Sequence, residues 1–177
     1  ISSKIKRIVY TSTMACIGTT PGKELSDETN EYNIWLPVND YMRSKGFAEA
    51  IVWQFIHAGA PVVIVNPTWT VGPGDINPTP VGEVILDAMR DKNPKITPAG
   101  INIVDVDDVG EGHVLAQEFG QIGERYILGG ENIEYPDLIN KIREYSGLPK
   151  IELVNETKSS FPADYLWYNS KKARDGL

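Results

Sequence analysis

The amino-acid sequence predicts an α/β fold in which parallel strands alternate with helices. In its first half, a β-branched run at residues 5–10 and a continuous apolar run at residues 62–65 flank a segment with helical spacing of apolar residues. A strand, a helix and a strand in this order form a crossover unit, which makes the two strands parallel. In the second half, shorter helical and strand-like segments continue to alternate. We therefore expect a parallel sheet with helices on both faces, followed by a smaller mixed α/β lobe.

The elements of the first half follow from their apolar residues. Residues 5–10 are rich in β-branched side chains, which predicts a short buried strand. A helix is expected from Asp40 to the Gly59 and Pro61 stop signals, with one face buried, because apolar residues recur at helical spacing. Residues 62–65 lack polar alternation, so both faces of this strand should be covered. The apolar residues of the helix are Phe47, Ala48, Ile51, Val52 and Phe55.

Turn-forming residues that follow the second strand indicate a change of architecture. Asn, Pro, Gly and Asp recur from Asn66 to Pro80, so we expect turns throughout this stretch and place a boundary near residue 75. Residues 1–75 then form the sheet domain, and residues 76–177 form the smaller, substrate-binding lobe. Periodicity and terminal residues predict helices at residues 83–90, from Asp107 onwards and at 135–145, with strands at 102–106 and 124–128.

Composition excludes two classes of partner. The 177 residues include 17 Lys and Arg against 24 Asp and Glu, which gives a net charge of −7. No basic run offsets this charge, so nucleic acid is not an expected partner. No apolar stretch approaches the roughly 18 residues that cross a bilayer, so no membrane span is expected. A single cysteine, Cys16, forms no internal disulfide and lacks metal-ligand neighbours, which favours a reducing, cytoplasmic location.

Tyr41 and Lys45 form the sharpest local pattern in the sequence. In a helix the two side chains lie one turn apart on one face. A lysine ammonium beside a phenol favours the phenolate, which suits the tyrosine to proton transfer at neutral pH. The spacing alone does not identify a site, because Tyr168 and Lys172 repeat it. Without further context, the commoner interpretation is that Tyr41 is a half-buried aromatic and Lys45 a solvated surface residue.

The context of Tyr41 distinguishes the two copies of this pattern. Upstream of Tyr41, the first predicted strand ends in the hydroxyl run at residues 11–13. Downstream, the second predicted strand leads into residues 66–73, which include Pro67 and Thr70. Ligands of open α/β sheets bind at the carboxyl ends of the strands. We therefore expect these three segments to converge on one crevice.

Four motifs occur in a fixed order along the chain: residues 9–13, Tyr41-x-x-Ser44-Lys45, residues 67–73 and residues 104–109. Together they make the sequence resemble the extended short-chain dehydrogenase/reductase family, also known as NAD-dependent epimerases/dehydratases. The resemblance covers nearly the whole chain. Residues 123–132 further resemble hopanoid-associated sugar epimerases and dihydroflavonol-4-reductase-like members.

The resemblance implies a partial Rossmann-like, doubly wound parallel sheet and the cofactor NAD or NADP. Tyr41 would be the general acid/base, and Lys45 would hold the nicotinamide ribose hydroxyls. Thr13, five positions before Gly18, would hydrogen-bond the reacting oxygen in preference to its neighbour Ser12. Pro67 and the backbone through Thr70 would lie against the nicotinamide. Trp69 would line the substrate pocket or, as large aromatics more often do, belong to the core between the lobes.

The resemblance also implies what the chain lacks. No Gly-x-Gly-x-x-Gly turn occurs, so the chain is expected to be the carboxyl-terminal part of a longer protein. The choice between NAD and NADP, between reductase and epimerase, and among nucleotide sugars, flavonoid-like ketones and sterols stays open. The family often pairs through the helix that carries the tyrosine, which implies a homodimer through the helix of Tyr41 and Lys45. The alternative is a non-catalytic binding or scaffold protein, or an inactive fragment.

Acidic residues at positions 105–108 are not expected to bind a metal. Asp107 and Asp108 open a predicted helix, where carboxylates cap the amino end and complement its dipole. His113 falls on the same helix as Val109, so a packed or capping histidine is the expected role. No metal site is predicted anywhere in the chain.

Overall fold

A computed structural model describes residues 4–32, 40–90, 98–151 and 165–177. Three parallel strands form the first sheet, in the order β1 (Ile8–Thr11), β2 (Val62–Pro67) and β5 (Arg125–Leu128). Val63 of the central strand pairs with Val9 on one side, and Val65 pairs with Tyr126 on the other. The predicted crossover unit and the parallel direction of its strands are confirmed.

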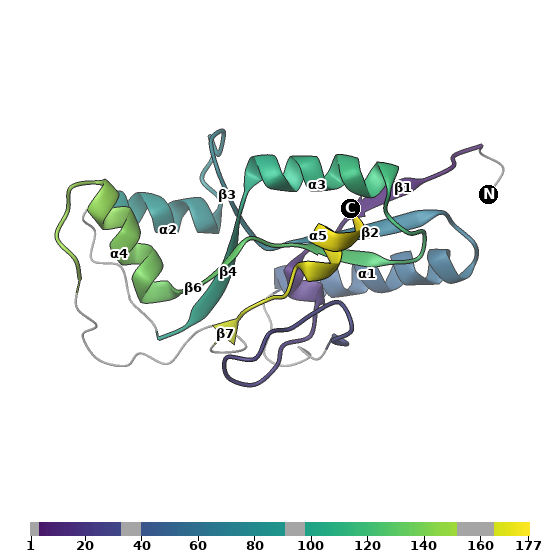
Figure 1. Cartoon of the computed structure of the whole chain (residues 1–177), viewed down its shortest axis with the longest axis horizontal. Coiled ribbons are helices and arrows are strands. Elements are labelled where there is room, and N and C mark those ends of the chain that lie inside the picture. The colour runs from purple at the N-terminus through teal and green to yellow at the C-terminus, as the bar shows by residue number, and fades with distance from the viewer. Residues whose placement is uncertain (1–3, 33–39, 91–97, 152–164) are drawn as a thin grey trace.

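Helices cover both faces of the first sheet. Figure 1 shows α3 (Val106–Glu118) and α1 (Asp40–His57) on opposite sides of it. Side chains of β2 alternate between the two: Val63 and Val65 pack in a cluster with Val109 of α3, whereas Ile64 packs with Trp53 of α1. This alternation follows from the period of two in an extended strand. The predicted α/β class with a doubly covered, Rossmann-like sheet is confirmed, and all four residues at 62–65 are buried.

The prediction of which side of α1 is buried is wrong. Phe47, Ile51 and Phe55 are each more than half exposed. Glu49 is the buried residue of this helix, and Val52, Trp53 and Ile56 pack on the sheet. Apolar residues occupy both sides of α1, so helical spacing alone did not identify the side that faces the sheet.

The first strand is also more exposed than the sequence predicts. Ile8 is 40% exposed, and no residue of β1 is fully buried. Within the described part of the chain, β1 pairs with β2 alone and forms the edge of the sheet. An edge strand has neighbours on one side only, so its apolar side chains are less completely covered.

A second sheet combines parallel and antiparallel pairing. Its strands are β3 (Trp69–Val71), β4 (Gly100–Asp105) and β6 (Glu131–Glu134), and β7 (Tyr165–Leu166) also pairs with β4. The strand β3 lies where turns were expected throughout, because its three residues are too few to produce a recognisable pattern. Helices α2 (Pro80–Met89) and α4 (Tyr135–Tyr145) pack on this sheet. The shared core is Ala88, Ala99, Ile101, Ile133, Tyr135, Leu138 and Ile139.

Short elements complete the chain and place its caps. The 3₁₀ helix η1 (Met14–Cys16) follows β1, and α5 (Lys171–Gly176) packs against β5. Asp105 caps α3 by accepting a hydrogen bond of 2.8 Å from the amide of Asp107, as expected for acids at a helix start. The boundary near residue 75 stays a prediction. Beyond it, β5 returns the chain to the first sheet, where it pairs with β2. No helix in the described ranges is long and apolar enough to cross a membrane.

Candidate active site

Ser12 and Thr13 lie directly after β1, beside the end of β2. The amide of Ser12 donates to the carbonyl of Val65 at 2.8 Å. Thr13 is buried and caps η1, since its hydroxyl accepts from the amide of Ala15 at 3.3 Å. Its carbonyl accepts from the side chain of Asn66 at 2.9 Å. The hydroxyl run and the end of β2 therefore meet at one place, as the sequence predicts.

Tyr41 and Lys45 lie one turn apart in the first half of α1. The Nζ of Lys45 is 5.8 Å from the centre of the Tyr41 ring, so the ammonium faces the aromatic ring. Tyr41 is 56% exposed, while Lys45 is half-buried. The hydroxyl of Ser44 donates to the carbonyl of Tyr41 at 2.8 Å, a local bond that occupies this side chain of the motif. The structure therefore places Tyr41 and Lys45 side by side on α1, as their spacing predicts.

Pro67 and Thr70 lie on either side of the passage from the first sheet to the second. Pro67 ends β2, opposite Leu128 of β5, and Thr70 lies in β3. The hydroxyl of Thr70 donates to the carbonyl of Thr68 at 3.2 Å. The hydroxyl oxygen of Thr68 is buried and lacks a hydrogen-bond partner within the described ranges. A buried polar atom without a partner calls for an explanation, and a bound ligand or a water molecule is one.

A cleft of about 480 Å³ opens next to Thr70. Its walls are the turn of residues 72–75, the beginning of α2, and Val106 at the start of α3. The turn approaches α3 closely: a β-carbon on Gly72 would lie 2.2 Å from the side chain of Val106. Only glycine fits at such a distance, so the turn keeps its position at the mouth of the cleft.

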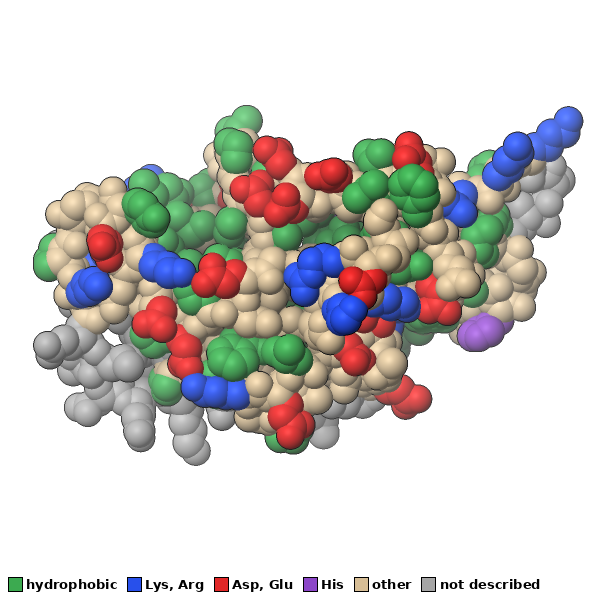
Figure 2. All heavy atoms as spheres, in the orientation of Figure 1, with side chains coloured by type: hydrophobic (Ala, Val, Ile, Leu, Met, Phe, Trp, Pro, Cys, Tyr) green, Lys and Arg blue, Asp and Glu red, His purple; other side chains and the backbone are tan. Residues whose placement is uncertain are grey.

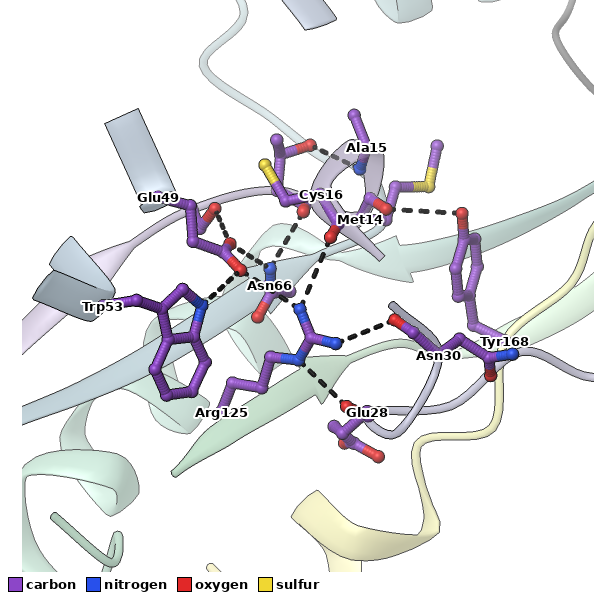
Figure 3. Close-up of polar contacts among 12 residues, drawn as sticks. Met14, Ala15, Cys16, Glu28, Asn30, Glu49, Trp53, Asn66, Arg125 and Tyr168 are labelled. Carbon is purple, nitrogen blue, oxygen red and sulfur yellow. Dashed lines mark hydrogen bonds and ion pairs between the residues drawn. The ribbon is translucent and has the colours of Figure 1, made fainter. Parts of the chain in front are cut away.

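A buried polar cluster, not predicted from the sequence, connects the segments of the site (Figure 3). Its centre is Glu49 of α1, which is 3% exposed and pairs with Arg125 of β5 at 3.1 Å. The carboxylate also accepts from the hydroxyl of Ser12, from Asn66 at 2.9 Å and from the indole of Trp53 at 3.3 Å. An acid one turn beyond Lys45 was the available signal, but its partner is 76 residues away along the chain.

Arg125 fixes the segment that leads from β1 toward α1. Its guanidinium donates to the backbone carbonyls of Glu28 at 3.0 Å and Asn30 at 2.8 Å, and to that of Cys16 at 3.4 Å. In Figure 3 the carbonyls of Glu28 and Asn30 lie on the side of the guanidinium away from Glu49, and one nitrogen donates to both Glu49 and Cys16. A planar guanidinium with five donors suits such a set of acceptors.

Cys16 borders the same cluster but is not suited to nucleophilic chemistry. Burial raises the pKa of its thiol from the ordinary value of 9.0 to about 11, and the nearby Glu49 carboxylate adds to this effect. The thiolate is the reactive form of cysteine, so this side chain stays inert at neutral pH. A structural role for Cys16 follows.

Two further residues take the roles that the sequence favours. The Nδ1 of His113 bonds to the carbonyl of Val109 at 2.7 Å, and the other ring nitrogen lies 2.8 Å from the hydroxyl of Thr11. His113 is therefore a packed histidine that ties α3 to β1. Trp69 packs against two core clusters and meets Tyr135 edge to face at a centroid distance of 6.4 Å. Of its two predicted roles, core between the sheets is the one that these contacts support.

Positive and negative side chains are interspersed over the face that Figure 2 displays.

The sequence profile described as the NAD dependent epimerase/dehydratase family matches residues 2–129 of the chain. The chain belongs to this family. The resemblance carried by the four ordered motifs is thereby confirmed, and the family's cofactor is a nicotinamide dinucleotide.

Relatives of this epimerase/dehydratase chain include reductases and epimerases. It is 36% identical to a putative dihydroflavonol 4-reductase from Synechocystis sp., an alignment that covers 94% of this chain and 49% of the relative. It is 32% identical to sterol demethylase protein B from Methylococcus capsulatus, with 85% of this chain and 45% of the relative covered. The chain spans about half the length of these curated relatives.

The fold matches that of a nucleoside-diphosphate-sugar epimerase from Pseudomonas aeruginosa. The two structures superpose with a TM-score of 0.85 at 26% identity, covering 98% of this chain and 61% of the other. Both sheets of the epimerase/dehydratase chain are therefore part of a common architecture.

Proposed function

We propose that the protein containing this chain is an NAD(P)-dependent oxidoreductase or epimerase with Tyr41 as its general acid/base. The reaction centre is a hydroxyl or carbonyl carbon of a small molecule. The observation that carries the proposal is the Tyr41–Lys45 pair, in which Nζ of Lys45 lies 5.8 Å from the centre of the Tyr41 ring. The helix that bears this pair lies within residues 2–129, the part of the chain that matches the epimerase/dehydratase family. The phenol oxygen of Tyr41 gives the proton to, or takes it from, the substrate oxygen.

Lys45 and Thr13 assist at the same oxygen. The ammonium of Lys45 stabilises negative charge on the phenol and binds the ribose hydroxyls of the cofactor. Thr13 hydrogen-bonds the reacting oxygen. Thr13 is chosen over its neighbour Ser12 because the hydroxyl of Ser12 already donates to Glu49.

The segment from Pro67 to Thr70 fits a nicotinamide dinucleotide at one definite point. The buried hydroxyl of Thr68 lacks a partner in the described ranges, so it offers a hydrogen bond to a polar group placed against this segment. When bound, the nicotinamide supplies hydride transfer. The residues of this chain then bind the ring through the backbone of Pro67 to Thr70 and handle the proton at Tyr41.

The cleft next to Thr70 is the proposed place for the remainder of the substrate. Its volume of about 480 Å³ suits a small organic molecule. Apolar side chains of Val71, Ile85 and Leu86 line it, together with the polar Asp75 and Thr79. A nucleotide sugar or a dihydroflavonol-like ketone, the chemistries that the names of the relatives contain, is the proposed substrate class.

The test uses the complete protein with NAD⁺, NADP⁺ and their reduced forms. Absorbance at the reduced-nicotinamide band follows hydride transfer with a panel of nucleotide sugars and aryl ketones, and product analysis detects epimerisation without net redox change. We expect turnover in the wild-type protein and its loss in Tyr41→Phe, with the dissociation constant for the cofactor changed by less than about threefold.

Val114→Asp is the matched control, because it places a charge at an equally exposed site on α3, away from the proposed centre. Turnover in this control should equal that of the wild type. Wild-type turnover in Tyr41→Phe would contradict the catalytic assignment, and failure of the wild type to bind any nicotinamide dinucleotide would contradict the enzyme proposal itself.

A homodimer through α1 is the second part of the proposal. Phe47, Ile51 and Phe55 follow one another at intervals of four residues and are 59%, 51% and 56% exposed. Such an apolar stripe on a helix suits a self-complementary interface. Sedimentation should give a dimer for the wild type and for Val114→Asp, and a monomer for Ile51→Asp. A wild-type monomer at all concentrations would rule out this interface.

A further inference from the structure

Glu49 is a carboxylate in a place where charge is expensive. It is 3% exposed, and the transfer of an isolated carboxylate from water to a protein interior is strongly unfavourable. Four donors compensate it. Oε2 accepts from Ser12 and from Asn66 at 2.9 Å, and Oε1 accepts from Arg125 at 3.1 Å and from Trp53 at 3.3 Å. Each oxygen thus has two donors, which is the full complement of a carboxylate.

Three of these donors come from the strands that frame the proposed centre. Ser12 follows β1, Asn66 lies in β2 and Arg125 begins β5, while Trp53 lies on the same helix as Glu49. Asn66 also donates to the carbonyl of Thr13 at 2.9 Å. Figure 3 shows the side chains of Glu49, Asn66 and Arg125 directed toward one another between the helix and the strands.

Every proposed catalytic or cofactor-binding segment has a neighbour in this cluster. Lys45 precedes Glu49 by one helical turn, and Tyr41 precedes it by two. Thr13 follows Ser12, and Pro67 follows Asn66. We propose that Glu49 is a positioning residue: its bonds to Ser12, Asn66 and Arg125 set where Tyr41 and Lys45 stand relative to Thr13 and Pro67. This inference rests on the proposed function and deepens it.

The contact surface of α1 explains why a polar anchor is needed. In the apolar cluster on the sheet, this helix contributes Val52, Trp53 and Ile56, which lie beyond Glu49 toward its carboxyl end; the helix also contacts η1. Apolar contacts are non-directional, so they resist separation of helix and sheet better than rotation or sliding of the helix. Hydrogen bonds to a single carboxylate have fixed directions, so they define both the rotation of the helix about its axis and its position along the sheet. In this proposal Glu49 adds direction to the contacts that hold the half of the helix carrying Tyr41 and Lys45.

Arg125 extends this control to the segment before α1. It binds Glu49 and, at the same time, the backbone carbonyls of Glu28 and Asn30. The ion pair is nearly covered, with side-chain exposures of 12% for Arg125 and 4% for Glu49. Displacements near 1 Å reduce turnover about a hundredfold when they misalign reacting groups. Loss of the Glu49 carboxylate should therefore lower turnover more than it weakens cofactor binding.

The experiment compares Glu49→Gln, Ser12→Ala and the control Glu111→Gln in the complete protein. Glu111 is an exposed carboxyl on α3, so its substitution matches the chemical change without touching the cluster. Thermal unfolding of each variant is measured first, and kinetics are recorded well below the lowest midpoint. The readouts are kcat, KM for the cofactor, and the pH–rate profile.

For Glu49→Gln we expect kcat to fall about tenfold or more, with KM for the cofactor changed less than about threefold. The pH at which turnover is half-maximal on its acidic side should move upward, since a displaced Lys45 supports a phenolate less effectively. Ser12→Ala removes one hydrogen bond and keeps the ion pair, so the same changes should appear in smaller size. Glu111→Gln should match the wild type.

A structural role alone would lower the unfolding midpoint and leave the pH–rate profile unmoved. If Glu49→Gln does not fold, Ser12→Ala carries the test, and wild-type kcat and profile in that variant overturn the inference. Tyr41→Phe separates the two proposals. If it retains turnover, the proposed function fails; if it abolishes turnover while Glu49→Gln and Ser12→Ala behave as wild type, only the positioning role fails.

Discussion

The same Tyr-x-x-x-Lys spacing occurs twice in this protein, in two opposite environments. Tyr41 and Lys45 lie on the continuous helix α1, where the ammonium is 5.8 Å from the centre of the exposed ring. Tyr168 is 2% exposed and lies before α5, with its hydroxyl donating to the carbonyl of Met14 at 3.4 Å. Lys172 instead pairs with Glu124 at 2.7 Å and lies over the ring of another tyrosine.

The comparison separates spacing from geometry. Four residues place two side chains together only within a helix, and Tyr168 stands outside one. Burial also decides what the phenol can do. The core around Tyr168 raises the pKa of its hydroxyl, so this group keeps its proton at every physiological pH. The second copy is a packed aromatic, and its lysine is a surface cation.

The largest expected difference between the copies is in turnover. Tyr41→Phe should reduce kcat about 10²–10⁴-fold, because it removes the proton-carrying hydroxyl and keeps the ring. Tyr168→Phe should leave kcat within about threefold and lower the free energy of unfolding by about 1 kcal/mol, the value of one hydrogen bond. Steady-state kinetics and urea unfolding measure both. Equal loss of turnover in the two variants would remove the distinction drawn here.

The lysines should differ less strongly. Lys45→Met should raise the dissociation constant of the cofactor about tenfold and lower kcat as well, because one ammonium serves both ribose and phenol. Lys172→Met breaks an ion pair whose members are 37% and 45% exposed, so its effect on stability should stay within about 1 kcal/mol. Titration of the cofactor followed by fluorescence measures the dissociation constant, and steady-state kinetics measure kcat. An unchanged dissociation constant in Lys45→Met would contradict its ribose contact.

The smallest difference should appear in the alkaline stability of the protein. Burial raises the pKa of Tyr168 above its ordinary 10.0, so above that pH the unfolded chain loses a proton that the folded chain keeps. The unfolded state then binds fewer protons, and the free energy of unfolding falls as the pH rises beyond about 10. Between roughly pH 9.5 and 11, the urea midpoint of Tyr168→Phe should fall less steeply than the midpoint of the wild type. Parallel curves would contradict the assignment.

Most of the fold could be predicted because its elements are long and periodic. The bounds of α4 agree with the sequence prediction, and those of α1 agree at its start. The strands β3 and β6, with three and four residues, are too short to show a period among Pro, Gly and Asn. The side of α1 that faces the sheet was also unpredictable, since Trp53 and Phe55 are equally apolar and only packing separates them.

The site could be predicted only in part, for a related reason. Thr13, Tyr41 and Lys45 belong to ordered motifs, so the sequence identifies them without knowledge of their surroundings. The Glu49–Arg125 pair joins residues 76 positions apart and depends on the register of β5 against β2. Long-range pairs of this kind follow from the tertiary structure and carry no local pattern. The sequence therefore identifies the residues of the proposed chemistry but not Glu49, the residue proposed to position them.

The position of β5 in the first sheet has a consequence for synthesis on the ribosome. β2 is the central strand, and one of its edges is completed by β5 only after β3, α2, β4 and α3 have been made. At roughly 5–20 residues per second, that edge stays open for several seconds. An apolar strand with unpaired backbone groups is a template for pairing with other chains. Nascent chains that pause before Arg125 should be the species that most requires a chaperone.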